Sequence, residues 1–398
     1  MRLLHVIPSM HPAGGGPIEG VRQLRKPLQA HGVEVHVCCG DAPDAPHIRD
    51  NEYPLIALGP GKGRYGLNLP MLRWLRDHCE DYDAIIVEGI WQFHSVALWL
   101  ATRGKRVPYF VFTHGMLDPW FKRRYPLKHL KKCLYWPIGD YWVLRHARAV
   151  LFTCEEERLR ARESFALYRC KEEIVSYGTS APPDDAARQR DAFLAAYPAA
   201  AGKRNLLFLG RLHEKKGCDL LLRAFAEVAH QDPALQLVMA GPCDHATRRA
   251  LVSIAEDAGI HGRVIWTGML AGDLKWGAFR TAEAFCLPSH QENFGVAVAE
   301  AMACGVPVLI SDKVNIWREI VQDEAGLAGD DSVAGTVAVL RQWLDVAPDA
   351  RARMGAAALA SFQKRFQVER VAARLVHLLG DRQDAMPAPD ASLHGEPY

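Results

Sequence analysis

The stretch HQENFGVAVAEAMACGVPVL, residues 290–309, places two carboxylates on either side of small, apolar residues that are expected to form a buried helix. Glu292 and Glu300 flank small, apolar residues, and the predicted helix ends at Gly305, with Pro307 just beyond. A buried carboxylate is costly unless something binds it. On an ideal helix the two would lie about 12 Å apart, more than the roughly 5–9.5 Å of glycosidase carboxylate pairs. The pattern favours carboxylates that bind opposite ends of one long ligand. The alternative is a half-exposed Glu292 and a salt-bridged Glu300.

Short apolar runs alternate with helical patterns on both sides of this stretch. Buried strands are predicted for LLHVIPS, VEVHVCC, AIIVEGI, PYFVFTH and AVLFTC, and later for NLLFLGR, LQLVMAGP, VIWTG, AEAFCLPS and VPVLIS. Such alternation indicates βαβ units and parallel sheets, here two doubly wound domains that face a cleft. Ligands of these sheets bind beyond the carboxyl ends of the strands, so residues just after strands are the candidates.

The length of 398 residues also favours two domains. We predict Rossmann-like domains over residues 1–180 and 205–365, joined by a linker at 181–204 that is rich in small and charged residues. A long amphipathic helical pattern occupies roughly residues 351–380, and a C-terminal helix is expected at 366–383. The tail, residues 384–398, lacks periodicity and is predicted to be disordered.

Bulk composition narrows the function classes. A formal net charge of +2 argues against wholesale nucleic-acid binding. The ten cysteines form no C-x-x-C pair, which is typical of reduced thiols in a cytosolic protein. No run reaches the roughly 18 apolar residues of a membrane span, and MRLLHVIPS is too short for a signal-peptide core. We expect a cytoplasmic protein, soluble or peripheral on the inner face of the cytoplasmic membrane.

Two further loops carry ligand-binding signals. Gly14 to Gly16 follow a strand and precede a helical pattern near Ile18, where the backbone approaches a ligand and a helix terminus favours phosphate. Their spacing is not G-x-G-x-x-G, and the alternative is a flexible turn. In FLGRLHEKKG, Arg211 and Lys216 follow another strand and suit a diphosphate, or else are solvated surface cations. A nucleotide sugar, with hydroxyls at both ends and a diphosphate between them, matches these loops and the two glutamates.

A D-x-D pattern, Asp81-Tyr82-Asp83, is the one metal-site signal that we weighed. It directly precedes the strand AIIVEGI and so lies at the amino end of that strand, away from the expected cleft. We read it as a turn that leads into the strand, and we expect no metal.

The E-x(7)-E motif, with GRLHEKKG upstream, resembles the retaining glycosyltransferases of family 4, the group 1 glycosyltransferases, over about residues 2–380. The resemblance implies the GT-B fold, with an acceptor-binding first domain, a nucleotide-sugar-binding second domain and a last helix that crosses back to the first. It implies a retaining hexosyltransferase without a protein nucleophile. The acceptor hydroxyl attacks on the face that the diphosphate leaves, and the protein positions the reactants and stabilises charge.

The same resemblance assigns roles to residues. Glu300 would bind ribose, Glu292 the donor sugar, Arg211 and Lys216 the diphosphate, and His114, in FVFTHGMLDPW, the transferred sugar; His114, Glu292, Arg211 and Lys216 form the implied catalytic set. The implied donor-binding set is Gly15, Gly16, Arg211, Lys216, Thr267, Gly268, Met269, Leu270, Asn293, Phe294, Gly295 and Glu300. No cofactor other than the nucleotide-sugar co-substrate is implied.

A basic, aromatic stretch covers residues 120–148, with Asp140 as its only acid. Cations interleaved with amphipathic aromatics suit an anionic membrane interface; the alternative is a solvated face with ordinary core aromatics. The expected membrane or acceptor face comprises Trp120, Lys122, Arg123, Arg124, Lys128, Lys131 and Lys132.

The expected acceptor is a glycan or a polyprenyl-diphosphate-linked glycan of bacterial surface polysaccharide biosynthesis. The alternatives are a soluble product, such as a disaccharide or sugar phosphate, and a catalytically silent nucleotide-sugar-binding scaffold. The silent scaffold is disfavoured because the residues of the implied site are all present: His114, Arg211, Lys216, Glu292 and Glu300.

Overall fold

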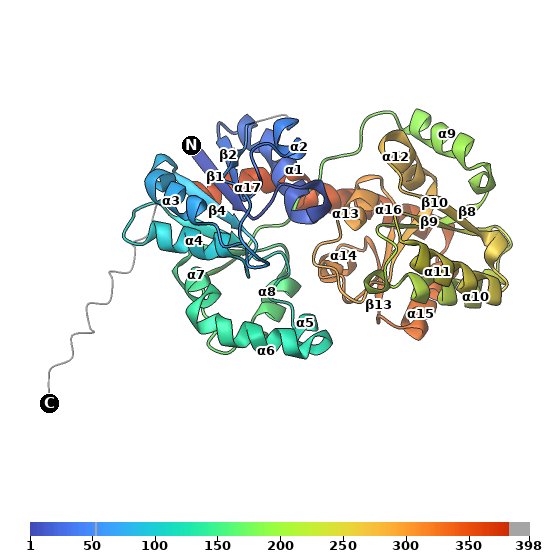
Figure 1. The fold of residues 1–398 in the computed structure, drawn as a ribbon. Helices are drawn as coiled ribbons and strands as arrows, with labels where there is room; N and C mark the ends of the chain where they lie inside the picture. The colour runs from blue at the N-terminus through green and yellow to red at the C-terminus, as the bar shows by residue number, and fades with distance from the viewer. Residues whose placement is uncertain (52–53, 382–398) are drawn as a thin grey trace.

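The computed structural model describes residues 1–51 and 54–381, which form two α/β halves that lie side by side (Figure 1). The first half holds a seven-stranded sheet in the order β3-β2-β1-β4-β5-β6-β7, and the second a six-stranded sheet in the order β10-β9-β8-β11-β12-β13. The strands pair in parallel throughout both sheets. The two doubly wound sheets predicted from the alternating pattern are therefore confirmed.

Ten of the strands in the described residues coincide with the predicted apolar runs, whereas β3, β7 and β13 were not predicted. Those of the first sheet are β1 (Arg2–Ile7), β2 (Glu34–Cys39), β3 (Ile56–Ala57), β4 (Ala84–Glu88), β5 (Tyr109–Phe112), β6 (Ala149–Phe152) and β7 (Glu172–Ile174). Those of the second are β8 (Arg204–Leu209), β9 (Leu235–Ala240), β10 (Val264–Gly268), β11 (Ala282–Leu287), β12 (Val308–Ser311) and β13 (Gly326–Gly329).

Helices cover both faces of each sheet. Those up to the last strand of the first sheet are α1 (Gly16–Ala30), α2 (Pro46–Arg49), α3 (Leu69–His78), α4 (Phe93–Thr102), α5 (Trp120–Arg124), α6 (Pro126–Tyr135), α7 (Asp140–His146) and α8 (Glu155–Ala161). The later helices are α9 (Ala186–Ala196), α10 (Cys218–Ala229), α11 (His245–Asp257), α12 (Gly272–Thr281), α13 (Val296–Ala303), α14 (Trp317–Gln322), α15 (Val333–Asp345), α16 (Pro348–Ser361) and α17 (Val368–Gly380).

The core of the first half lies in two layers because neighbouring residues of a strand point to opposite faces. Leu3 of β1 packs in a cluster with Leu24 of α1 and Leu375 of α17. Leu4, the next residue, packs with Leu75 of α3 and Leu98 of α4. Helix α17 thus packs on the first sheet although it follows the second sheet in the chain.

Two expected segments differ from the structure. The linker expected at 181–204 contains the helix α9, which packs against α12 of the second half through buried residues that include Phe193. The continuous helical pattern over 351–380 is broken into α16, a π-helical turn (Phe362–Phe366) and α17. Phe362 and Phe366 are both buried in the second core, which the π-helical turn allows. The expected tail, residues 384–398, lies outside the described residues.

Both sheets reverse their strand order at an internal pair, β1/β4 in the first and β8/β11 in the second. Loops that leave such a pair diverge and create a crevice for a ligand. Among the described residues, no helix is both long enough and apolar enough to cross a membrane.

Candidate functional site

The second half contributes two loops that leave β8 and β11 at the point where the strand order reverses. The carbonyl of Lys215, after β8, accepts hydrogen bonds from the backbone N–H of His290 and the hydroxyl of Ser289, after β11, at 2.9 and 2.8 Å. Gly217 permits this approach: its φ is +66°, and a Cβ there would lie 2.0 Å from the carbonyl oxygen of Pro288. The loops that hold Lys216 and Glu292 are therefore one joined structure.

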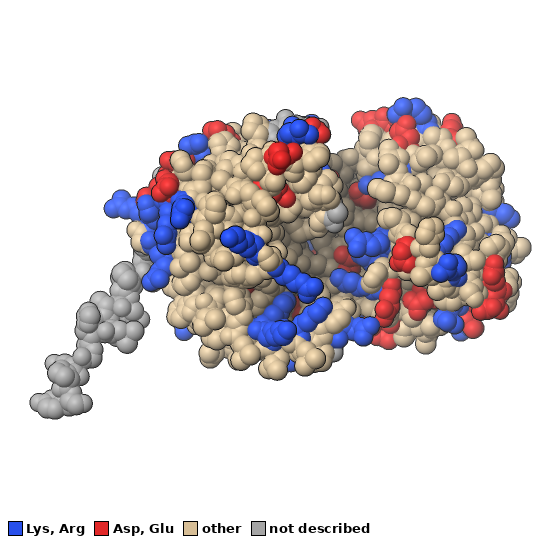
Figure 2. Space-filling view, in the orientation of Figure 1, with Lys and Arg blue, Asp and Glu red and all other residues tan. Residues whose placement is uncertain are grey.

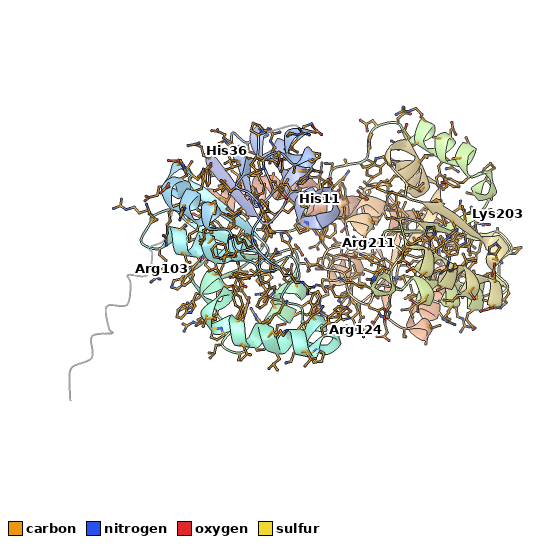
Figure 3. The ribbon with its side chains drawn as sticks, viewed as in Figure 1. His11, His36, Arg103, Arg124, Lys203 and Arg211 are labelled. Carbon is orange, nitrogen blue, oxygen red and sulfur yellow. The ribbon has the colours of Figure 1, made fainter. Side chains whose placement is uncertain are left out.

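Lys216 and Glu292 form an ion pair in this joined structure. Burial lowers the pKa of Lys216 to about 8, and the neighbouring charges of Lys215 and Arg211 lower it further. The Glu292 backbone is held on its other side, where its N–H donates to Lys313 and its carbonyl accepts from the N–H of Asn315. Arg211, by contrast, is exposed, and it lies across from His11 at the gap between the halves (Figure 3).

Glu300 is buried in α13, and its Oε1 lies 2.5 Å from Nζ of Lys275 in α12. Burial raises the pKa of this carboxyl, while Lys275 lowers it and the charge of Glu19 in α1 raises it further. The sequence predicted the burial and, as one alternative, the salt bridge. Glu19 is a first-half residue, so Glu300 lies near the interface of the two halves.

Helix α13 begins only at Val296, with Gly295 at φ +77° as its N-cap. Glu292 therefore lies outside the helix, and the 12 Å spacing of an ideal helix does not describe the pair. Phe294 is buried, and its ring contacts Tyr177 and Phe366 at centroid distances of 5.7 and 5.5 Å. Its side chain belongs to the core that joins the halves, which leaves only its backbone for a ligand.

In the first half, His114 follows β5 and is held by Glu88 at the end of β4. Nε2 of His114 lies 2.6 Å from one carboxylate oxygen of Glu88, and Nδ1 of His5 lies 2.6 Å from the other. Burial would raise the pKa of Glu88, but its contacts with His114 and His5 lower it to about 2. The carboxylate thus stays ionised and fixes both imidazole rings.

His114 has a φ of +49°, an uncommon conformation for a residue other than glycine. The adjoining Gly115 has a φ of +72°, and its N–H donates to the buried Glu157 at 2.6 Å. Glu157 also accepts from the hydroxyls of Thr113 and Thr153 at 2.8 and 2.7 Å. A buried carboxylate therefore maintains the strained backbone that presents His114.

Contacts across the gap bring the two sides together. Asn293 donates to Thr153 at 3.3 Å, and a Cβ on Gly115 would lie 2.7 Å from Oδ1 of Asn293. Asn293 directly follows Glu292, and Gly115 directly follows His114. The predicted sugar-binding glutamate and the predicted active-site histidine therefore lie on neighbouring segments of opposite halves. A hollow is visible between the two halves (Figure 2).

The remaining predicted donor residues lie around the same edge. Gly15, with a φ of +77°, caps α1, whose first residue is Gly16, and a Cβ on either would meet no atom within 4 Å. The segment Thr267 to Leu270 ends β10, where Met269 is exposed and Gly268 accepts from the N–H of Gly241. This places that segment at the carboxyl edge of the second sheet.

Two further sets of acidic residues have partners of their own. Asp83 accepts from the N–H of Arg2 at 2.8 Å, at the amino end of β4, as expected for a turn that leads into the strand. Asp312, Asp330 and Asp331 gather with ligand oxygens within 4.8 Å of one another. Lys313 lies within 4.0 Å of all three carboxylates and neutralises part of their charge.

Three residues near the site were missed by the sequence analysis. Lys275 has no local signal, because only the packing of α12 on α13 brings it to Glu300. Glu157 likewise reads as one acid in an ordinary EEER helix start. Glu88 did carry a signal, because it ends a strand of otherwise apolar residues at the edge where ligands bind.

Comparisons with known proteins bear on the family and the fold of the chain. The family model described as "Glycosyl transferase 4-like domain" matches residues 15–178, and the one described as "Glycosyl transferases group 1" matches residues 189–360. A D-inositol 3-phosphate glycosyltransferase of Rhodococcus erythropolis is 27% identical over 352 residues, which cover 81% of this chain and 78% of the relative.

Solved structures share the fold over nearly the whole chain. A sucrose-phosphate synthase from Thermosynechococcus elongatus superposes with a TM-score of 0.75 at 20% identity, covering 95% of this chain and 98% of its own. The Anabaena protein HepE, in complex with UDP and glucose, superposes with a TM-score of 0.74 at 17% identity, covering 96% and 100%. The two-sheet architecture is the one these proteins have.

Proposed function

Because the chain belongs to the group 1 glycosyltransferases of family 4 type and has the GT-B fold, we propose that it transfers a hexosyl group with retention. The donor is a UDP- or GDP-sugar, and the acceptor is a glycan or a polyprenyl-diphosphate-linked glycan. The observation that carries the proposal is the meeting of Asn293 and Gly115, which sets Glu292 opposite His114 across the gap.

The ion pairs suggest how the donor would enter. In the free protein Lys216 is paired with Glu292. When the donor binds, the hydroxyls of its sugar take the place of Lys216 as partners of this carboxylate, and Lys216 binds the diphosphate. Glu300, which keeps Lys275, accepts hydrogen bonds from the ribose hydroxyls. Arg211, exposed at the gap, provides the second charge on the diphosphate. The side-chain cations then stabilise the leaving group without a metal ion.

In the proposed reaction the acceptor oxygen forms a bond to the anomeric carbon while the bond to the diphosphate oxygen breaks. The acceptor proton passes to an oxygen of the departing diphosphate, so the products are a glycoside and a nucleoside diphosphate. His114, fixed by Glu88, contacts the transferred sugar and positions it for attack on the face that the diphosphate leaves.

The acceptor distinguishes two versions of this function. A lipid-linked glycan of bacterial surface polysaccharide biosynthesis is favoured by the basic stretch at residues 120–148, and would keep the enzyme at the inner face of the cytoplasmic membrane. A soluble product is the second version, supported by relatives that bear the names D-inositol 3-phosphate glycosyltransferase and sucrose-phosphate synthase.

A thermal-shift screen of UDP-, GDP- and ADP-sugars tests the donor side. The matching donor should raise the melting temperature, because a ligand that binds only the native state stabilises it. Slow hydrolysis of that donor should release the sugar first in the donor's anomeric configuration, as observed by NMR. Inversion at that carbon would contradict retention, and donor binding without any turnover would favour the silent scaffold.

A further inference from the structure

Helix α6 presents its apolar side to solvent. We define the leucine ridge as Leu127, Leu130, Leu134 and Ile138, the last of which lies in the short helix that follows α6. Their exposed fractions are 78%, 58%, 71% and 74%. Positions three or four residues apart share one side of a helix, so the four side chains form one continuous strip. Exposed apolar strips of this kind mark interaction sites.

The inward side of the same helix is polar or amphipathic, the reverse of an ordinary surface helix. Lys132 packs over the ring of Trp91 at 4.3 Å, and the ring of His129 lies 4.9 Å from that of Phe165. Tyr135 is hydrogen-bonded to Tyr65 at 2.6 Å. These contacts fix the rotation of α6, and none of its residues is buried. The ridge therefore cannot turn inward without breaking them.

Cations border the ridge. Lys128 and Lys131 lie in α6 and Lys122 in α5; all three are exposed, and within the described residues they form no salt bridge. The only acid of residues 120–148, Asp140, is buried. Lysine and arginine side chains gather on this side of the first half (Figure 2). The Arg123 side chain lies outside the part of the chain that the structure describes.

The ridge also adjoins the candidate site. Arg124, at the end of α5, lies 3.5 Å from Glu214 of the other half (Figure 3). Lys215, next to Lys216, lies 5.8 Å from the ring centroid of Trp120. A surface seated on α6 would thus meet the opening of the gap between the halves.

We propose that the leucine ridge inserts into the leaflet of an anionic phospholipid bilayer that faces the protein, while Lys122, Lys128 and Lys131 contact its headgroups. The strip of apolar side chains, flanked by cations that form no salt bridge among the described residues, is complementary to acyl chains beneath anionic phosphates. This inference deepens the proposed function, because it places a lipid-linked acceptor at the opening of the site. The placing of the acceptor rests on the proposed function. The docking itself requires no nucleotide.

Co-sedimentation with vesicles of phosphatidylcholine and phosphatidylglycerol, without nucleotide, tests the proposal. The full-length protein should bind these vesicles and should bind pure phosphatidylcholine vesicles much less. Changing Leu127, Leu130 and Leu134 to Ser should lower the partition coefficient by about tenfold or more for each leucine. Changing Lys128 and Lys131 to Gln should lower it by about fivefold each at low salt, and much less at high salt.

Leu167→Ser is the matched control, because this leucine is 79% exposed but lies outside the ridge; it should bind vesicles as the wild type does. The triple serine variant should keep its nucleotide-induced thermal shift, which separates docking from donor binding. The inference is wrong if the wild type ignores anionic vesicles at low salt or if Leu167→Ser loses as much binding as the ridge variant. It is equally wrong if the ridge instead closes a homodimer that the triple variant dissociates. Loss of the thermal shift in the wild type would overturn the donor assignment and leave the docking result standing.

Discussion

Glu88 and His114 are joined by a 2.6 Å contact between Oε2 and Nε2, and this contact determines which nitrogen of the imidazole carries a proton. An ionised carboxylate accepts only, so Nε2 of His114 must donate. Glu88 belongs to β4 and His114 follows β5, so two adjacent strands fix the ring. Glu88 is therefore a positioning residue for the group that we assign to the transferred sugar.

Glu88→Gln should lower the turnover number by about 10- to 100-fold with little change in donor KM, because a misplaced catalytic group impairs the reaction more than ground-state binding. The amide cannot accept from both histidines through two oxygens, so one ring loses its orientation. Steady-state kinetics with saturating acceptor measures the effect. Glu80→Gln, at an exposed glutamate paired with Lys105, is the control. An unchanged turnover number in Glu88→Gln would show that the contact is only structural.

The same carboxylate makes a pH prediction. Its pKa falls from the ordinary value of 4.5 to about 2 in the folded protein. A depressed pKa means that the ionised form stabilises the fold above pH 4.5 and that this contribution is lost as the pH falls toward 2. Between pH 4.5 and pH 2 the unfolding free energy of Glu88→Gln should therefore fall by about 2–4 kcal/mol less than that of the wild type. Urea denaturation at a series of pH values measures it; parallel curves for the two proteins would contradict the assignment.

Gly115 and Gly104 form a matched pair for testing the meeting of the halves. Both have positive φ, +72° and +76°, so an alanine is strained at either position. A Cβ at Gly115 would lie 2.7 Å from Asn293, whereas at Gly104 it would meet nothing within 4 Å. The transfer rate of Gly115→Ala should be lower than that of Gly104→Ala by about tenfold or more. A tenfold loss corresponds to about 1.4 kcal/mol of activation free energy. Similar activities in the two variants would mean that the halves need not approach here during catalysis.

Metal independence is the next expectation. Transfer should survive EDTA, because in the proposed complex Arg211 and Lys216 neutralise the diphosphate in place of a metal cation. The assay uses purified protein with and without EDTA, followed by addition of Mg²⁺ or Mn²⁺. Activity abolished by EDTA and restored by Mn²⁺ would overturn this view, and would direct attention to the Asp312, Asp330 and Asp331 cluster as well as to Asp83.

How far the sequence predicts this protein depends on whether a feature is local. The strands and the position of Glu300 in a buried helix follow from apolar runs and small neighbours. The pairing of Glu300 with Lys275 does not, because the two are 25 residues apart and meet only through helix packing. The sequence of helix α9 predicts a linker, because its residues are mostly small or charged. Its buried face is determined by contact with α12, which the local sequence does not reveal. The break at Phe362 is equally non-local, because apolar periodicity continues through it.

Lys275→Gln should raise the pH at which nucleotide binding is lost on acidification. Lys275 lowers the pKa of Glu300 against the effect of burial, so its removal raises that pKa further. In the proposed complex the ribose hydroxyls donate to the ionised carboxylate, so binding of the nucleoside diphosphate should weaken on acidification at a higher pH than in the wild type. Calorimetry between about pH 5 and pH 8 measures this, a range in which an unperturbed glutamate is largely ionised. Coincident pH profiles would separate Glu300 from nucleotide binding.

The last prediction divides the ligand between the two glutamates. Glu300→Ala should weaken binding of the nucleoside diphosphate alone by about tenfold or more, since a hydrogen bond to a charged group contributes about 1.5–3 kcal/mol. Glu292→Ala should not weaken it, because Lys216 is then released from its ion pair and is free for the diphosphate. Transfer should nevertheless fall sharply, since the donor sugar loses its carboxylate. Lys216→Met should have the opposite effect: the variant should lose affinity for the nucleoside diphosphate although Glu292 is still present. Equal losses of diphosphate affinity in the two glutamate variants would mean that the carboxylates do not hold opposite ends of the donor, and unchanged turnover in both would remove them from the active site.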